Sequence, residues 1–291
     1  MRTLSGLGFF IIYANPGVFY ACLGNNVLIL AVHVNDCILT GTSRRLIMHY
    51  KHKLNACHAL TDLGLVHWLL GIKVTCNCAV HTISLSQSTF IYTILSHFSL
   101  ADAKPHGSPM VPGVVYSKND FPSSPNKAAC MQCTPYRQAI GSLMYLAIAM
   151  HPNIAFAVLI LSCFLNNPRD VHWEAVKCIY RYLKFTKDMS LIYGSDQHDL
   201  EGYTDADGST QEDQQAISSY AFLINGGAIS WSAKRQELVT LLTAKAEYVT
   251  AMHTAKEALW LHKLFGDILP NLVHPPTMLQ CNNQSAIKLL K

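Results

Sequence analysis

Residues 28–41 read LILAVHVNDCILTG, two apolar runs on either side of the polar pair Asn35-Asp36. Two apolar runs of strand length joined by a short polar break are typical of two β-strands and a tight turn. Such a turn aims its side chains at one point, because the two strands fix where it lies. The stretch therefore predicts a strand–turn–strand unit that presents the Asp36 carboxylate and the Asn35 amide together.

A second informative stretch covers residues 201–291. Its pattern predicts three short strands, a long helix, a strand and the start of another helix, with Gly226-Gly227 as a hairpin turn. The expected elements are 200–205, 217–224, 228–231, 243–265, 278–281 and 285–290. This stretch carries EGYTDADGS at its beginning, AKAEYVT in the long helix and CNNQSAIKLLK at its end.

The chain between these two stretches alternates strands and helices. We expect helices at 43–60, 88–98, 136–149, 153–165 and 171–186, and strands at 68–74 and 82–85. Residues 104–135 hold six prolines and little periodicity, which predicts a linker. The predicted divisions are therefore 1–103, the linker 104–135, a helical region 136–195, and a final unit 199–291.

Composition excludes several classes of protein. The chain has 291 residues, of which half are apolar and 14% are charged, so bulk disorder is not expected. No stretch reads as a membrane span, and a weakly signal-like N-terminus is followed by the turn sequence Asn15-Pro16-Gly17. We expect an intracellular protein with no membrane partner. A small-molecule α/β enzyme is a rival class, but no Gly-rich phosphate loop follows a strand and no nucleophile elbow is present.

Cysteine is frequent, with ten residues in the chain. Free thiols are the better interpretation in a reducing compartment. The alternative is a zinc site that uses the pairs Cys76-x-Cys78 or Cys130-x-x-Cys133, completed by His81 or His106.

The motifs taken together resemble the Pol polyprotein of copia-type retrotransposons, from late reverse transcriptase into RNase H. In that family the first hairpin reads Tyr-Val-Asp-Asp or His-Val-Asp-Asp, and here it reads His33-Val34-Asn35-Asp36. Further blocks that resemble the family are Thr61–Gly64, Trp68–Ile72, Ser84–Gln87, Pro109-Met110, Tyr136–Tyr145, His172–Ala175 and Arg181–Lys184. The resemblance covers essentially the whole chain in the right order.

The resemblance implies an α/β fold class: an α+β remnant of the polymerase palm and connection region, then an incomplete RNase H-like fold. Enzymes of this kind hold two divalent ions about 3.5–4 Å apart with carboxylates. By family pattern the metal ligands would be Asp36 in the polymerase site, and Asp205 and Glu247 in the nuclease site. The implied cofactor is Mg²⁺. The implied partners are an RNA/DNA hybrid or a primer–template, with no small-molecule substrate.

Two positions depart from the family pattern at its catalytic residues. Asn35 stands where the family has the first hairpin aspartate, and Asn282 stands where it has the third nuclease carboxylate. Asparagine keeps the shape of aspartate but carries no charge. A further polymerase carboxylate would lie upstream of Met1, and a fourth nuclease carboxylate beyond Lys291. We therefore expect the protein to be catalytically inactive.

The departures from the family pattern share one type of nucleotide change. Asn35, Asn282, Cys178, His262 and Lys245 each differ from the family residue by one G-to-A or C-to-T change in a codon. The hypothesis is a decayed gene copy. The alternative is a domesticated nucleic-acid-binding protein without catalysis, whose contacts would be the basic side chains Lys177, Arg181 and Lys184; a solvated helix face is the competing interpretation of those three residues.

Overall fold

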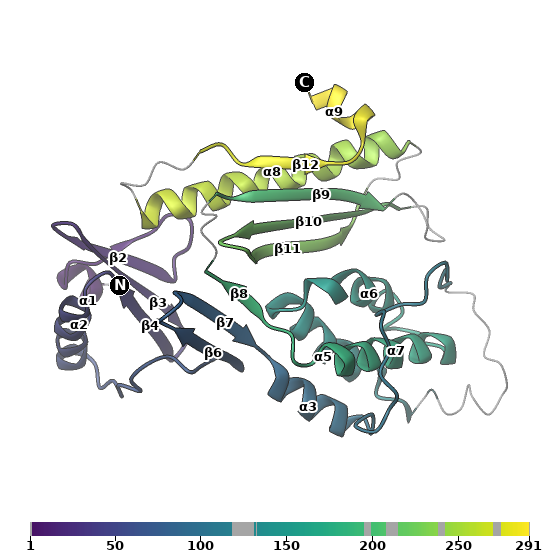
Figure 1. Ribbon diagram of the computed structural model, residues 1–291, viewed down its shortest axis with the longest axis horizontal. Coiled ribbons are helices and arrows are strands. Elements are labelled where there is room, and N and C mark those ends of the chain that lie inside the picture. The colour runs from purple at the N-terminus through teal and green to yellow at the C-terminus, as the bar shows by residue number, and fades with distance from the viewer. Residues whose placement is uncertain are drawn as a thin grey trace. The chain divides into compact units, whose positions relative to one another are not determined.

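The computed structural model describes residues 2–117, 131, 133–194, 199–207, 215–237, 242–269 and 275–290. The chain forms two compact units (Figure 1). One unit consists of residues 1–67 with 256–276, and the other of residues 68–255 with 277–291. Helices and several sheets occur together, so the predicted mixed α/β class is confirmed.

The first unit contains an antiparallel sheet in chain order. Its strands are β1 (Phe10–Ile11), β2 (Val18–Leu23), β3 (Asn26–His33) and β4 (Asp36–Gly41). Leu28 and Leu30 of β3 are buried against Tyr50 and Leu54 of helix α2 (Arg44–Cys57). The alternation of buried and accessible positions along β3 is what a sheet with one covered face requires. A short helix, α1 (Arg2–Gly6), precedes the sheet.

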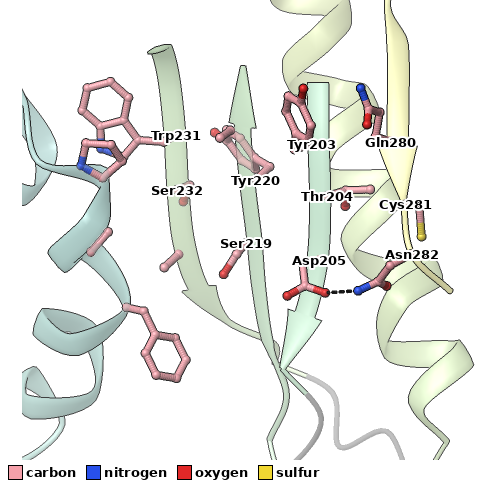
Figure 2. A pocket seen from close by; sticks show the side chains of 15 residues that line it. Tyr203, Thr204, Asp205, Ser219, Tyr220, Trp231, Ser232, Gln280, Cys281 and Asn282 are labelled. Atoms are coloured by element: carbon pink, nitrogen blue, oxygen red, sulfur yellow. Dashed lines mark hydrogen bonds between the residues drawn. The ribbon is translucent and has the colours of Figure 1, made fainter. Parts of the chain in front are cut away.

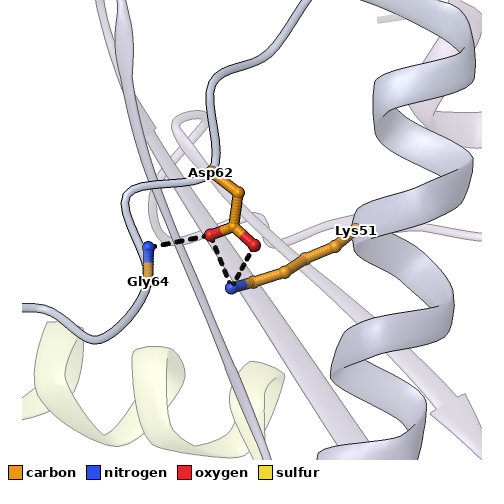
Figure 3. A network of polar contacts seen from close by, with 3 residues as sticks. All are labelled: Lys51, Asp62 and Gly64. Carbon is orange, nitrogen blue, oxygen red and sulfur yellow. Dashed lines mark hydrogen bonds and ion pairs between the residues drawn. The ribbon is translucent and has the colours of Figure 1, made fainter.

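A loop after α2 is fixed by one carboxylate (Figure 3). Asp62 accepts hydrogen bonds from Lys51 Nζ at 2.8 Å and from the backbone amide of Gly64 at 3.0 Å. The hydrogen bond from Lys51, followed by that from Gly64, lowers the pKa of the Asp62 carboxyl. The loop is thus held at its centre, although Leu63 and Leu65 on the same segment are 88% and 82% exposed.

The second unit contains a small antiparallel sheet with order β5-β6-β7-β8. Its strands are β5 (Trp68–Leu69), β6 (Ile72–Asn77), β7 (Thr82–Ser86) and β8 (Leu191–Tyr193). The single strand predicted at 68–74 is wrong, because a turn at Leu70-Gly71 divides it into β5 and β6. Both turn residues have positive φ, at 47° and 77°, and the Tyr145 hydroxyl donates to the Leu70 carbonyl.

Four helices build most of the core of this unit. They are α3 (Ser88–His97), α5 (Tyr136–Ala149), α6 (Pro152–Ser162) and α7 (Asp170–Thr186), close to the predicted bounds. Ile140, Leu143, Val176 and Leu183 are completely buried in one cluster. Ile217 of the last sheet belongs to the same cluster, so helices and sheet share a core.

The last sheet has the order β11-β10-β9-β12 (Figure 1). Its strands are β9 (Glu201–Asp207), β10 (Ile217–Ile224), β11 (Gly227–Arg235) and β12 (Met278–Cys281), and β12 runs parallel to β9. The first half of helix α8 (Thr243–Ile268) packs on one face of this sheet through Thr250 and Thr254, and α9 (Gln284–Leu290) follows β12. The predicted order of three strands, helix, strand and helix is confirmed.

The predicted linker is described only in part. Residues 104–117 form no helix or strand, and most of the remainder, Cys130 included, lies outside the described residues. Among those that are described, no helix is long and apolar enough to cross a membrane.

Candidate functional site

Alternation along β9 decides which side chains reach each face of the last sheet. Thr204 is buried and accepts a hydrogen bond from Thr254 of α8, so even-numbered positions of β9 face the helix. Tyr203 and Asp205 therefore face the opposite side. Asp205 is exposed there, where the strand approaches its end.

Asn282 lies directly beside Asp205 (Figure 2). It follows the last residue of β12, and β12 pairs with β9 through Cys281 and Thr204. The Asn282 side-chain amide donates a hydrogen bond from Nδ2 to Asp205 Oδ1 at 3.2 Å. The pairing of two strands far apart in sequence thus brings together two of the residues that the sequence singles out.

Glu247 reaches the end of β9 from the first turns of α8. Its side chain is 5% exposed, and the backbone amide of Ala206 donates to its carboxylate. Burial raises the pKa of the Glu247 carboxyl, and the negative charge of nearby Asp205 raises it further, while the Ala206 hydrogen bond opposes both. Its other oxygen, Oε2, is buried without a hydrogen-bond partner in the described structure.

These three residues form a small anionic site at the end of β9. Asp205 and Glu247 supply the charge, and Asn282 supplies a neutral amide that already occupies one Asp205 oxygen. No group of three or more His, Cys, Asp or Glu side chains suited to a metal ion occurs in the described ranges. Pairs of divalent ions are usually held by several carboxylates, and this site brings together two, one of them buried. The zinc alternative gains no support, since Cys76 and Cys78 are exposed and free.

The other candidate carboxylate belongs to the hairpin between β3 and β4. The predicted strand–turn–strand is confirmed, with His33 paired to Asp36 across a turn of Val34 and Asn35. Asn35 and Asp36 are both exposed. Val34 has a φ of 53°, which is unfavourable for a β-branched residue. Backbone strain of this kind gathers at functional turns.

A cavity of about 540 Å³ opens on the sheet face that carries Asp205 (Figure 2). Asp205 and Asn282 line it together with Tyr203, Trp231 and Gln280. The sequence reasoning missed the last three, which carry no acidic or nucleophilic group. Their placement in neighbouring strands brings them together. The odd-numbered alternation along β9 and β11 was a signal for Tyr203 and Trp231, whereas Gln280 is placed by the pairing of β12 with β9.

The basic side chains on α7 have partners within their own unit. Arg181 Nε donates to the Lys104 carbonyl at 2.7 Å, and Lys184 Nζ donates to the carbonyls of Ala101 and Ala103 at 2.6 and 2.9 Å. Lys177 forms an ion pair with Glu174 at 2.6 Å. Arg181 and Lys184 thus hold the chain that follows α3 against α7, whereas the Lys177 ion pair lies within α7.

Comparison with known proteins identifies the class. The family described as "Reverse transcriptase (RNA-dependent DNA polymerase)" matches residues 1–112, a range that includes the β3–β4 hairpin. The Pol polyprotein of tobacco transposon TNT 1-94 is 37% identical over 96% of the chain, and that of Arabidopsis thaliana transposon RE2 is 29% identical over 99%. A secreted RxLR effector protein, number 161 of Plasmopara viticola, is 38% identical over 45% of the chain and 94% of its own length.

The family match over residues 1–112 thus places this chain in the reverse transcriptase class. The chain belongs to the Pol polyproteins of copia-type retrotransposons. It spans about a fifth of the length of the tobacco and Arabidopsis relatives, 21% and 19% respectively.

Proposed function

We propose that this chain is a reverse transcriptase and RNase H segment that has lost metal-dependent catalysis at both of its sites. Its partners would be those of the class, a primer–template or an RNA/DNA hybrid. The observation that carries the proposal is the hydrogen bond from Asn282 Nδ2 to Asp205 Oδ1. While Asp205 Oδ1 accepts this hydrogen bond, the lone pair that points toward Asn282 cannot also bind a metal cation.

Charge supports the same conclusion. Reverse transcriptases generally use Mg²⁺, a hard cation that prefers anionic oxygen. An amide in place of a carboxylate removes one unit of negative charge beside the ion. At about 4 Å and an effective dielectric constant of about 20, each unit charge contributes several kcal/mol of attraction to a dication before desolvation.

The polymerase hairpin presents the same substitution. Asn35 occupies the turn beside Asp36, so the tip of the hairpin carries one carboxylate where the family resemblance implies two. Val34 in the same turn has a φ of 53°. We infer that the backbone of the hairpin persists while its charge does not.

Two assays on the full chain test the proposal. Labelled primer–template with nucleotides, and a labelled RNA/DNA hybrid, are each incubated with the protein in Mg²⁺ and in Mn²⁺. We expect neither extension nor cleavage above a buffer control. Cleavage by the unmodified chain that disappears in Asp205→Asn would overturn the proposal for the nuclease site. Extension that disappears in Asp36→Asn would do so for the hairpin.

A non-catalytic nucleic-acid-binding role through α7 is less well supported. It needs Lys177, Arg181 and Lys184 to be available to phosphates, whereas these side chains contact Glu174 and the carbonyls of residues 101–104. Phosphate contacts would have to displace those partners.

A further inference from the structure

The cavity on the last sheet has walls that suit a flat ring. Tyr203, Ala221 and Trp231 form one cross-strand row through β9, β10 and β11. All three line the cavity, and Phe156 of α6 lines it from the side. The row therefore places an aromatic side chain at each end and a methyl group in the middle.

The two aromatic side chains are held in place by their polar ends. The Trp231 indole donates from Nε1 to the Ala147 carbonyl at 2.7 Å. The Tyr203 hydroxyl donates to Glu201 at 3.1 Å and also interacts with the Gln280 side chain. Rings fixed in this way lose little conformational freedom when a ligand binds, which favours affinity.

The spacing of the strands leaves room for one ring. Adjacent strands lie about 4.8 Å apart, so the strands that carry Tyr203 and Trp231 are about 10 Å apart. A planar ring that stacks on one aromatic neighbour needs about 3.5–4 Å, the distance at which carbon atoms touch. The short side chain of Ala221 keeps the floor of this space open. A volume of about 540 Å³ lies within the range of small-molecule sites.

The second row across the same face supplies polarity. Asp205 pairs with Ser219 in register, and Asn282 lies next to Asp205. Asn282 donates to Oδ1 of Asp205, and within the described residues no hydrogen bond is made to Oδ2, which can accept from a ligand that enters the cavity. A carboxylate oxygen favours a ligand that offers an N–H group, and it disfavours an anion or a carbonyl oxygen at the same point.

The geometry points to a nucleobase pocket: one unstacked base with an exocyclic amine, cytosine or adenine, seated over Ala221 and stacked on Tyr203, with Trp231 as the far wall and the amine of the base on Asp205. Stacking supplies most of the affinity, and Asp205 discriminates against thymine and uracil, whose corresponding position is a carbonyl. This inference rests on the proposed function, since it names what the inactive site would bind. It does not require a metal ion, a phosphate contact or catalysis.

The test measures binding of fluorescently labelled single strands of about 15 nucleotides to the full chain by anisotropy. Oligo-dC should bind at least about tenfold more tightly than oligo-dT. Tyr203→Ala should weaken oligo-dC binding by about tenfold or more, as expected for the loss of one stacking partner. Asp205→Asn should remove most of the preference for dC, because the amide can donate to a thymine carbonyl. Affinity should change little with salt, unlike binding through phosphates.

Phe185→Ala is the matched control, because Phe185 is 63% exposed on α7 and does not line the cavity. It should bind as the unmodified chain does. Free cytidine distinguishes the source of the base: competition only at far higher concentration assigns the pocket to a strand, and competition at similar concentration assigns it to a free nucleoside. Equal binding of dC and dT, or binding that Tyr203→Ala leaves unchanged, would overturn the pocket. Neither result bears on the cleavage assay, which tests the proposed function separately.

Discussion

Asn282 differs from aspartate only in its terminal group, and that difference can be reversed. The substitution Asn282→Asp places a third negative charge beside Asp205 and near Glu247, and it removes the N–H that now occupies Asp205 Oδ1. We expect Mg²⁺ affinity, measured by calorimetry, to rise at least tenfold, which corresponds to about 1.4 kcal/mol.

The matched control for this residue is the adjacent Asn283→Asp. It adds the same charge one position along the chain, where the side chain caps α9 by accepting from the Ala286 amide at 2.9 Å. Its effect on Mg²⁺ affinity should be small. If both substitutions raise the affinity equally, the gain reflects general surface charge and not the site.

Glu247 gives the site a pH dependence whose sign follows from its raised pKa. Its ordinary pKa is 4.5, and the folded-state pKa lies above that value because of burial and the Asp205 charge. The folded protein therefore binds more protons than the unfolded chain between the two values, so stability falls as pH rises through that window. Glu247→Gln should increase stability at pH 7, because the amide carries no charge to bury beside Asp205.

Thermal melts of the two proteins across the acidic range check this expectation. The difference in Tm should be largest at neutral pH and should vanish below the ordinary pKa of 4.5, where the carboxyl is protonated in both states. A constant difference at all pH values would show that shape, not charge, is responsible.

At the scale of elements, α8 is joined to its sheet by a buried polar network. Thr250 Oγ1 lies 2.8 Å from Ser218 Oγ of β10, and Gln236 Nε2 donates to Ser218, to Thr250 and to the Ala246 carbonyl. Thr250→Val keeps the shape of the side chain but removes a buried hydroxyl that donates to the Ala246 carbonyl, accepts from Gln236 and bonds Ser218. We expect a loss of about 1–3 kcal/mol in the free energy of unfolding, measured by denaturant titration.

Thr93→Val is the control for that loss. Thr93 on α3 also donates to the carbonyl four residues earlier, that of Thr89, but it is exposed, so water can replace the bond. Its change should stay within about 0.5 kcal/mol. Equal losses for the two threonines would mean that the network adds nothing beyond the local helix bond.

Helices and strands were predictable from sequence where the apolar periodicity and the turn or capping residues indicate the same boundaries. The β3–β4 hairpin and the long helices have apolar spacings that only one structure satisfies, and the structure follows them closely. The prediction was wrong at Leu70-Gly71, because the surrounding apolar run looks like one continuous strand. Leu70 has a positive φ there, and no polar turn residue stands at its position to indicate the turn. The strand β8 was missed because three residues, 191–193, are too few to show alternation, and pairing with β7 makes them a strand.

The candidate site was predictable only in the residues that carry motif signals. Asp205 and Asn282 carry motif signals, and parallel pairing of β12 with β9 places them together. Tyr203 and Trp231 belong to the same surface through strand register, which a single sequence does not specify. The catalytic roles implied for Asp36, Asp205 and Glu247 remain predictions.

For the whole molecule, we expect exposed apolar side chains to promote self-association in solution. Leu63 and Leu65 are 88% and 82% exposed on a loop that Asp62 holds in place, so the loop cannot fold them away without losing the Lys51 contact. We expect self-association at high protein concentration. The double substitution Leu63→Ser/Leu65→Ser should increase the monomeric fraction, measured by light scattering, with little change in Tm.

Leu28→Ser provides the opposite comparison, because Leu28 is completely buried in the first unit. It should lower Tm and increase aggregation through unfolding. If the Leu63/Leu65 double variant self-associates as much as the unmodified chain, another surface of the molecule mediates the self-association.

The compact units divide the chain in a way that a linear sequence conceals. Residues 256–276 belong with residues 1–67, and the helices of 136–186 share a core with the last sheet through Ile217. The predicted divisions at 103, 135 and 195 follow changes in composition. The predicted divisions remain predictions about the order of segments along the chain. Which segments form one compact unit depends on which apolar faces pack together.

The Asn282 amide can also change chemically while the purified protein is stored. Asparagine side chains hydrolyse slowly in water, and Asn282 is exposed in a bend at the end of β12. Hydrolysis would replace the donor with a second anion, so the attraction to Asp205 would become repulsion. A stored preparation would then drift into a mixture of two charge forms that ion exchange can separate. Fresh and aged samples of one sequence would differ in how they bind cations, and the age of the protein would become a variable of every binding experiment.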